Sequence, residues 1–100
     1  MRKIESQMLQ AIRQGKSWEL DNTRVYVDDF GNWKVYLFNN LICDKFGGQL
    51  SVYTIHQTST TKSRLNVILR EFCGKSIYQK DYIWFYSDNT YTNNGRTFFI

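Results

Sequence analysis

The chain has 100 residues and a formal charge of +4, with seven Tyr, seven Phe and three Trp. This length predicts one domain spanning residues 1–100. No apolar run approaches the ~20 residues of a membrane helix, which argues against a membrane partner. Cys43 and Cys73 lack the spacing of a zinc site, so two free thiols or a single disulfide remain as alternatives. The mildly basic charge fits a nucleic acid, an acidic protein partner or mere solubility.

The first half of the chain predicts a helix followed by an antiparallel meander. Apolar residues recur at helical spacing within residues 1–14, and Gly15 can end that helix. Residues 17–22 are interpreted as a connector, with Trp18 over the junction between helix and sheet. Alternating side chains and turn residues then predict four strands, at residues 23–27, 33–38, 41–46 and 50–56.

The turn between the second and third strands sets their register. Asn39-Asn40 is a two-residue hairpin signal, because asparagine tolerates positive φ. The resulting register places Leu37 opposite Ile42, but it also brings Asp44 onto the core face. A β-bulge or a shorter strand would resolve that conflict.

A second helix is predicted over residues 60–73. The hydroxyl cluster at residues 58–61 can cap its first turn, and Gly74 can end it. Four apolar side chains recur at i, i+3, i+4 and i+7 and are expected to pack on the sheet: Leu65, Ile68, Leu69 and Phe72.

The remainder of the chain returns to β character, with expected strands at residues 76–79, 82–86 and 97–100. The predicted fold class is therefore α+β. Its expected order is an N-terminal helix, a four-stranded antiparallel meander, a second helix packed on the sheet, and a C-terminal β-hairpin.

The polar side of the second helix is a candidate contact surface. Lys62, Asn66 and Arg70 stack on a face turned away from the apolar stripe. The start of this helix can hold an anion, since free backbone amides there combine with hydroxyls and positive charge. The residues concerned are Thr60, Thr61, Lys62, Ser63 and Arg64. The alternative is a capped helix start with two solvated cations.

The aromatic run at residues 82–86 is a second candidate. Tyr82, Trp84 and Tyr86 share one side of the expected strand. Exposed aromatics on a sheet stack nucleic-acid bases or anchor protein interfaces. The alternative is a strand that is buried on both faces.

The sequence predicts no catalytic residues, no cofactor and no metal site. His56 is the single histidine, and no nucleophile motif accompanies it. Asp28-Asp29 lacks the further oxygen ligands of a cation loop. Gly47-Gly48 lacks the Gly-Lys-Ser/Thr end of a phosphate loop. Both pairs are interpreted as turns.

Two segments carry a resemblance to a known family. Residues 35–42 (Val-Tyr-Leu-Phe-Asn-Asn-Leu-Ile) and 60–66 (Thr-Thr-Lys-Ser-Arg-Leu-Asn) resemble those of small tailed-bacteriophage proteins. Phe38, Asn39 and Lys62 stand where that family usually has His, Gly and Arg. The resemblance implies a viral origin and a place of action in the host cytoplasm, and it leaves the function open.

Two functions follow as expectations. Small phage proteins without catalytic residues often counter host defence, as anti-CRISPR proteins do. Size and resemblance therefore imply an inhibitor that binds a host protein or protein–nucleic-acid complex. The alternative is a protein that binds nucleic acid directly, using the basic helix face and the aromatic strand. A minor virion component and a homodimer also remain open.

Overall fold

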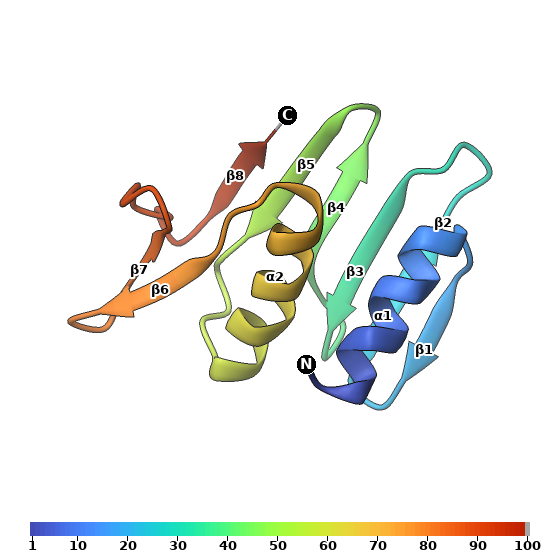
Figure 1. Cartoon of the computed structure of the whole chain (residues 1–100), viewed down its shortest axis with the longest axis horizontal. Helices are drawn as coiled ribbons and strands as arrows, with labels where there is room; N and C mark the ends of the chain where they lie inside the picture. The colour runs from blue at the N-terminus through green and yellow to red at the C-terminus, as the bar shows by residue number, and fades with distance from the viewer. Residues whose placement is uncertain (100) are drawn as a thin grey trace.

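The computed structural model describes residues 1–99, in which two helices cover one face of a six-stranded antiparallel sheet (Figure 1). The helices are α1 (Lys3–Gln14) and α2 (Ser59–Phe72). The sheet has the order β1-β2-β3-β4-β5-β8, with bounds Trp18–Leu20, Thr23–Val27, Trp33–Leu37, Asn40–Phe46, Gln49–Tyr53 and Arg96–Phe99. A separate hairpin, β6 (Ile77–Lys80) and β7 (Ile83–Tyr86), lies beside α2.

Helix α1 forms where the apolar spacing predicted it. Met8, Leu9 and Ile12 lie on one side of α1 and are buried. Gly15 ends the helix in the left-handed conformation (φ 66°), and its N–H group donates to the carbonyl of Ile12 at 3.2 Å. The expected stop signal at Gly15 is therefore confirmed.

The predicted meander forms, but its β3–β4 turn lies one residue earlier than expected. Phe38 and Asn39 both have positive φ, 50° and 65°, so Leu37 pairs with Asn40. The predicted turn at Asn39-Asn40 was therefore wrong. Asparagine signalled the turn correctly, yet the first left-handed position falls on Phe38, and phenylalanine carries no such signal.

A β-bulge in β4 resolves the conflict over Asp44. The register shifts between Val35 and Tyr36, which leaves Ile42 as the extra residue on β4. Ile42 and Cys43 are both buried as a result. Asp44 pairs with a lysine on the face that the helices leave uncovered.

Two strands belong to the main sheet although the sequence did not place them there. β1 pairs Trp18 with Val25, whereas this segment was expected to be a connector. Three residues are too few to show an alternating pattern. β8 pairs Arg96 with Tyr53 of β5, so the C-terminal hairpin consists of β6 and β7 alone. Ile100, expected in the last strand, lies outside the described residues.

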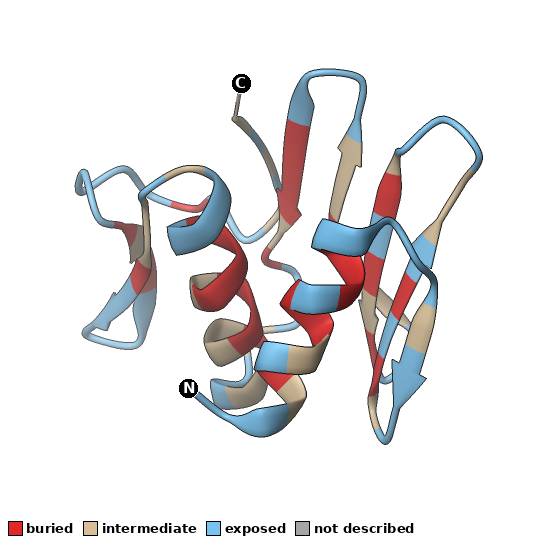
Figure 2. Ribbon diagram, turned by 45° about the vertical axis from the view of Figure 1, so that its right-hand side comes forward, coloured by how far each residue is buried: buried red, intermediate tan, exposed pale blue. Residues whose placement is uncertain are grey.

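Helix α2 supplies the centre of the core. Leu65, Ile68 and Leu69 are fully buried, as predicted. Phe72 was also expected to be buried but is 41% exposed, and its ring lies 5.5 Å from that of Trp33. Because Phe72 is the last residue of α2, only part of its ring meets the core. Figure 2 shows the buried residues of both helices on the sides that face the sheet.

Within residues 1–99, neither helix is both long enough and apolar enough to cross a bilayer. The same part of the chain brings no three metal-binding side chains together. Cys43 and Cys73 are free thiols in the structure. Burial raises the pKa of the Cys43 thiol well above its ordinary value, so this thiol stays protonated and unreactive.

Candidate binding surfaces

The anion site expected at the start of α2 is filled by the protein's own Glu5. Arg64 is only 3% exposed, and its Nη1 donates to Glu5 Oε2 at 2.9 Å. Ser63 Oγ donates to the same carboxylate at 2.5 Å, and Arg64 Nε donates to Thr23 Oγ1 at 3.1 Å. Arg64 was expected to contribute to an anion site at the helix start, with a solvated cation as the alternative. The structure corrects this, because a buried guanidinium needs a buried partner.

Glu5 stays ionised inside this network. Burial opposes the charge of the carboxylate, but the hydrogen bonds from Ser63 and Arg64, together with the Arg64 charge, outweigh that effect. The pKa of Glu5 therefore lies below its ordinary value. The ion pair thus joins α1 to α2 through fully charged side chains.

The hydroxyl cluster before α2 forms a helix cap. Thr58 Oγ1 accepts a hydrogen bond from the backbone N–H of Thr61 at 3.0 Å. Thr61 Oγ1 lies 2.9 Å from Thr58 Oγ1, and Thr61 is buried. Thr60 is half-buried. These contacts describe a capped helix start and leave no open cradle made of Thr60, Thr61 and Ser63.

The polar side of α2 has two kinds of side chain. Asn66 Nδ2 donates to the carbonyl of Ile77 at 3.1 Å, and the N–H of Ile77 donates to Asn66 Oδ1 at 2.5 Å. Asn66 therefore fastens β6 to α2 and was wrongly expected to be free for binding. Arg70 is exposed and Lys62 is partly exposed, and neither forms an ion pair within residues 1–99.

A shallow hollow of about 690 Å³ lies between the start of α1 and α2. Arg2 and Arg70 line it together with Ser63, Asn66 and Val67. Glu5 also lines it, but the carboxylate of Glu5 is already bonded to Arg64. We name four cations that form no ion pair within residues 1–99 the basic helix surface: Arg2, Lys3, Lys62 and Arg70.

The aromatic strand contributes less exposed surface than expected. Trp84 and Tyr86 face the core and are buried, which corrects their assignment to a contact surface. Tyr82 lies outside β7, in the β6–β7 turn, with φ 65° and 90% exposure. Tyr82 alone of the three therefore faces solvent. The alternation in the sequence correctly placed Trp84 and Tyr86 on the same side of the strand. Tyr82 precedes the strand and does not share that side.

The sheet face opposite the helices is a surface that sequence reasoning did not single out. The open sheet face is made of residues that the strand registers place on the side away from the helices, among them Arg24, Tyr26, Lys34, Tyr36, Asp44, Phe46, Ser51, Tyr53, Arg96 and Phe98. The guanidinium carbon of Arg24 lies 4.5 Å from the ring centre of Tyr36, and that of Arg96 lies 4.3 Å from Phe98. In the sequence, the signal for this face was the alternation of Arg24 and Tyr26 with Val25 and Val27.

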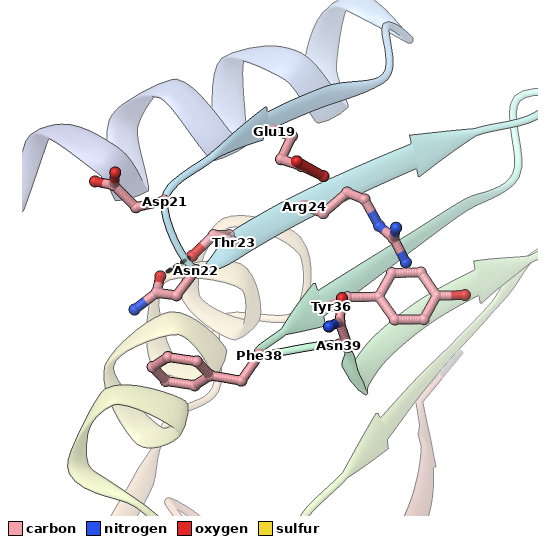
Figure 3. A pocket seen from close by; sticks show the side chains of 8 residues that line it. All are labelled: Glu19, Asp21, Asn22, Thr23, Arg24, Tyr36, Phe38 and Asn39. Atoms are coloured by element: carbon pink, nitrogen blue, oxygen red, sulfur yellow. Dashed lines mark hydrogen bonds between the residues drawn. The ribbon is translucent and has the colours of Figure 1, made fainter.

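Two hollows shape the open sheet face. One, of about 520 Å³, lies near the β3–β4 turn, where Figure 3 shows the Arg24 side chain beside the Tyr36 ring. Its lining residues are Glu19, Asp21, Asn22, Thr23, Arg24, Tyr36, Phe38 and Asn39. The other, of about 240 Å³, is lined by Tyr26, Asp28, Asn32, Trp33, Lys34, Asp44, Lys45 and Phe46.

Asp28 and His56, the residues considered for cation binding and catalysis, both lie in segments between secondary-structure elements. The Asp28 carboxylate accepts hydrogen bonds from the backbone N–H groups of Phe30 and Asn32, as a turn residue does. His56 is exposed and lies in the segment between β5 and α2.

Comparison with known proteins gives one family match. No curated protein and no solved structure matched the chain. The model of a bacteriophage protein family, described as Kyanoviridae Gp96 protein, matches residues 1–99. This match agrees with the phage origin that residues 35–42 and 60–66 implied. The chain therefore belongs to the Kyanoviridae Gp96 protein family.

Proposed function

We propose that this phage protein is a non-catalytic binding protein that acts on a host macromolecular complex in the host cytoplasm, as an inhibitor of host defence would. The observation that carries the proposal is the separation of charge in the helix layer, residues 2–16 and 59–75. This layer holds eight cations and two carboxylates, a formal charge of +6. Both carboxylates are engaged by arginines of the same layer.

The two ion pairs between the helices, one buried and one exposed, leave the outward charge of the helix layer positive. Glu5 is bound to Arg64 in the interior, and Glu71 accepts two hydrogen bonds from Arg13, at 2.6 and 2.9 Å. The cations of the basic helix surface form no ion pair within residues 1–99, so their electrostatic field extends into the solvent. Such a field attracts a negatively charged partner and speeds its association. The proposed partner surface is therefore acidic.

A second candidate function is direct binding of nucleic acid. The hollow lined by Arg2 and Arg70 favours it, because guanidinium groups just before α1 and on α2 suit neighbouring phosphates. Salt dependence separates the two candidates. For a duplex, each phosphate contact contributes about −0.9 to the slope of log affinity against log salt. Each cation that is removed should then flatten this slope by about one unit.

The test is a charge-reversal pair with a matched control. Lys62→Glu with Arg70→Glu removes the centre of the basic helix surface. Lys16→Glu with Lys80→Glu changes the net charge equally at two exposed positions outside the basic helix surface, just after α1 and in β6. Thermal melts should show all three proteins folded. Each tagged protein is then incubated with host lysate and with a labelled oligonucleotide, and bound partners are identified by mass spectrometry.

The expected result is that the helix-surface variant loses the defined host complex, while the wild type and the control variant retain it. If only the oligonucleotide is lost, the second candidate holds. Equal binding by both folded variants would remove the basic helix surface from the function.

A further inference from the structure

The last strand of the main sheet offers a second interaction surface. β8 pairs with β5 and stands at the end of the strand order, as Figure 1 shows. We infer that the free edge of β8 binds β8 of a second copy of this chain in antiparallel orientation, so that two six-stranded sheets become one continuous sheet. This inference goes beyond the proposed function, because no residue of the basic helix surface takes part in it.

The backbone of β8 has two sets of hydrogen-bonding groups that point away from β5. The N–H of Thr54 donates to the carbonyl of Gly95 at 2.8 Å, one step before the pair Tyr53–Arg96. Hydrogen-bonded and non-hydrogen-bonded pairs alternate along an antiparallel ladder. The N–H and C=O groups of Arg96 and Phe98 therefore point to the free edge. Within residues 1–99, no backbone–backbone hydrogen bond outside the strand ladders involves either residue.

A two-fold register centred on Thr97 matches these free groups. Arg96 of each copy then lies opposite Phe98 of the other, and each of these two pairs exchanges two N–H···O bonds. Thr97 faces Thr97 of the second copy in a non-hydrogen-bonded pair. Because the two copies use the same strand, the contact closes in a dimer and leaves no further β8 edge exposed.

The side chains of β8 explain why the fitting partner is a second copy. The guanidinium carbon of Arg96 already lies 4.3 Å from the ring centre of Phe98 in the same chain. Phe98 is 47% exposed, so its ring can accept another cation. In the register centred on Thr97, each Phe98 ring is flanked by its own Arg96 and by Arg96 of the second copy. The two arginines lie on a diagonal, about 7–8 Å apart at the backbone, which limits their repulsion.

The first test measures self-association of the wild-type chain. Two strands of four residues form an interface smaller than about 1,200 Å², so the dimer should be weak and should form only at high concentration. Sedimentation velocity between about 10 μM and about 1 mM should show a monomer–dimer equilibrium. Isotope-filtered NOE spectra of mixed labelled and unlabelled chains should connect the Hα atoms of Thr97 in the two copies, whose Cα atoms are expected about 4.5 Å apart.

Opposite charges at a single position test the register. Phe98→Lys places a cation opposite Arg96 of the second copy and should weaken the dimer about tenfold or more. Phe98→Glu loses the same ring but places a carboxylate there, and should dimerise at least about tenfold more tightly than Phe98→Lys. Tyr26→Lys is the control, because Tyr26 is an exposed ring on the same face in β2, three strands away from β5 and four from β8. It should dimerise as the wild type does.

Thermal melts should show that all these variants fold. Lys62→Glu with Arg70→Glu should also dimerise normally, which separates this inference from the proposed function. A wild-type chain that stays monomeric at about 1 mM would overturn the inference. Equal dimerisation of Phe98→Lys and Phe98→Glu, or assemblies larger than a dimer, would overturn it as well.

Discussion

The carboxylates of the helix layer and those beside the open sheet face have different surroundings. In the helix layer, Glu5 and Glu71 are each bound by an arginine of the other helix, so the side chains left outside are cationic. On the sheet side, carboxylates such as Glu19 and Asp21 line a hollow beside aromatic rings. The modest net charge of +4 therefore conceals two surfaces of different character. A chain-wide charge cannot tell which partner each surface suits.

The sharpest way to break this comparison is to remove the partner of the buried carboxylate of Glu5. Arg64→Ala should lower the free energy of unfolding by about 3–5 kcal/mol, because Glu5 is left as an unpaired buried charge. The exposed counterpart on the same helix, Arg70→Ala, should change stability by about 0.5 kcal/mol or less. Urea unfolding of both variants measures the difference. Similar losses for both would contradict the internal role of Arg64.

A second comparison sets the covered face of the sheet against the open face. Leu69→Ala should cost about 2–5 kcal/mol, since Leu69 is fully buried under the helix layer. Phe46→Ala, on the uncovered side, should stay within about 0.5 kcal/mol. Guanidinium unfolding gives both values. A large loss at Phe46 would mean that the open sheet face is part of the stabilising core.

The sequence predicted the elements of the covered face well. Alternation located β2 and β3, and helical spacing located α1 and the buried side of α2, because both patterns are local. The burial of Arg64 could not be predicted in this way. Its partner Glu5 lies 59 residues earlier, and only the packing of two helices brings them together. The open sheet face was missed for the same reason, since alternation does not say which side the helices cover.

The same limit of sequence-based prediction applies to single residues on the polar side of α2. Lys62 and Arg70 were placed on the outer side of α2, and the structure leaves them unpaired there within residues 1–99. Asn66 shares their helical face, yet its amide is used by the backbone of Ile77. A sequence gives the direction of a side chain on a helix, but it does not give the segment that packs above it.

The pH dependence of stability tests the ionised state of Glu5. Its folded pKa is lowered, so its contribution is fully present above the ordinary value of 4.5 and is lost as pH falls through the folded pKa. Wild-type stability should therefore decrease below about pH 4.5. Glu5→Gln should be less stable at neutral pH and should show a shallower decrease in acid. Part of the decrease should persist, because the pKa values of Asp28 and Asp88 are also lowered.

The smallest expected effect concerns the β3–β4 turn at the edge of the open sheet face. Phe38 is exposed and has φ 50°, a conformation that disfavours a bulky side chain. Phe38→Asn should raise the free energy of unfolding by about 1 kcal/mol, because asparagine tolerates this conformation. Differential scanning calorimetry detects the shift. A lower melting temperature would show that the Phe38 ring contributes packing that its exposure conceals.

The pairing of β8 with β5 has a consequence for the order of folding. β1 to β5 are joined by short turns, so their contacts form between residues close in the chain. β8 must find β5 across residues 54–95, which contain α2 and the hairpin. Because of the entropy of closing that long segment, we expect this contact to be the slowest of the sheet to form. During synthesis, the meander can assemble while the last strand is still absent, and the edge of β5 stays open until β8 arrives.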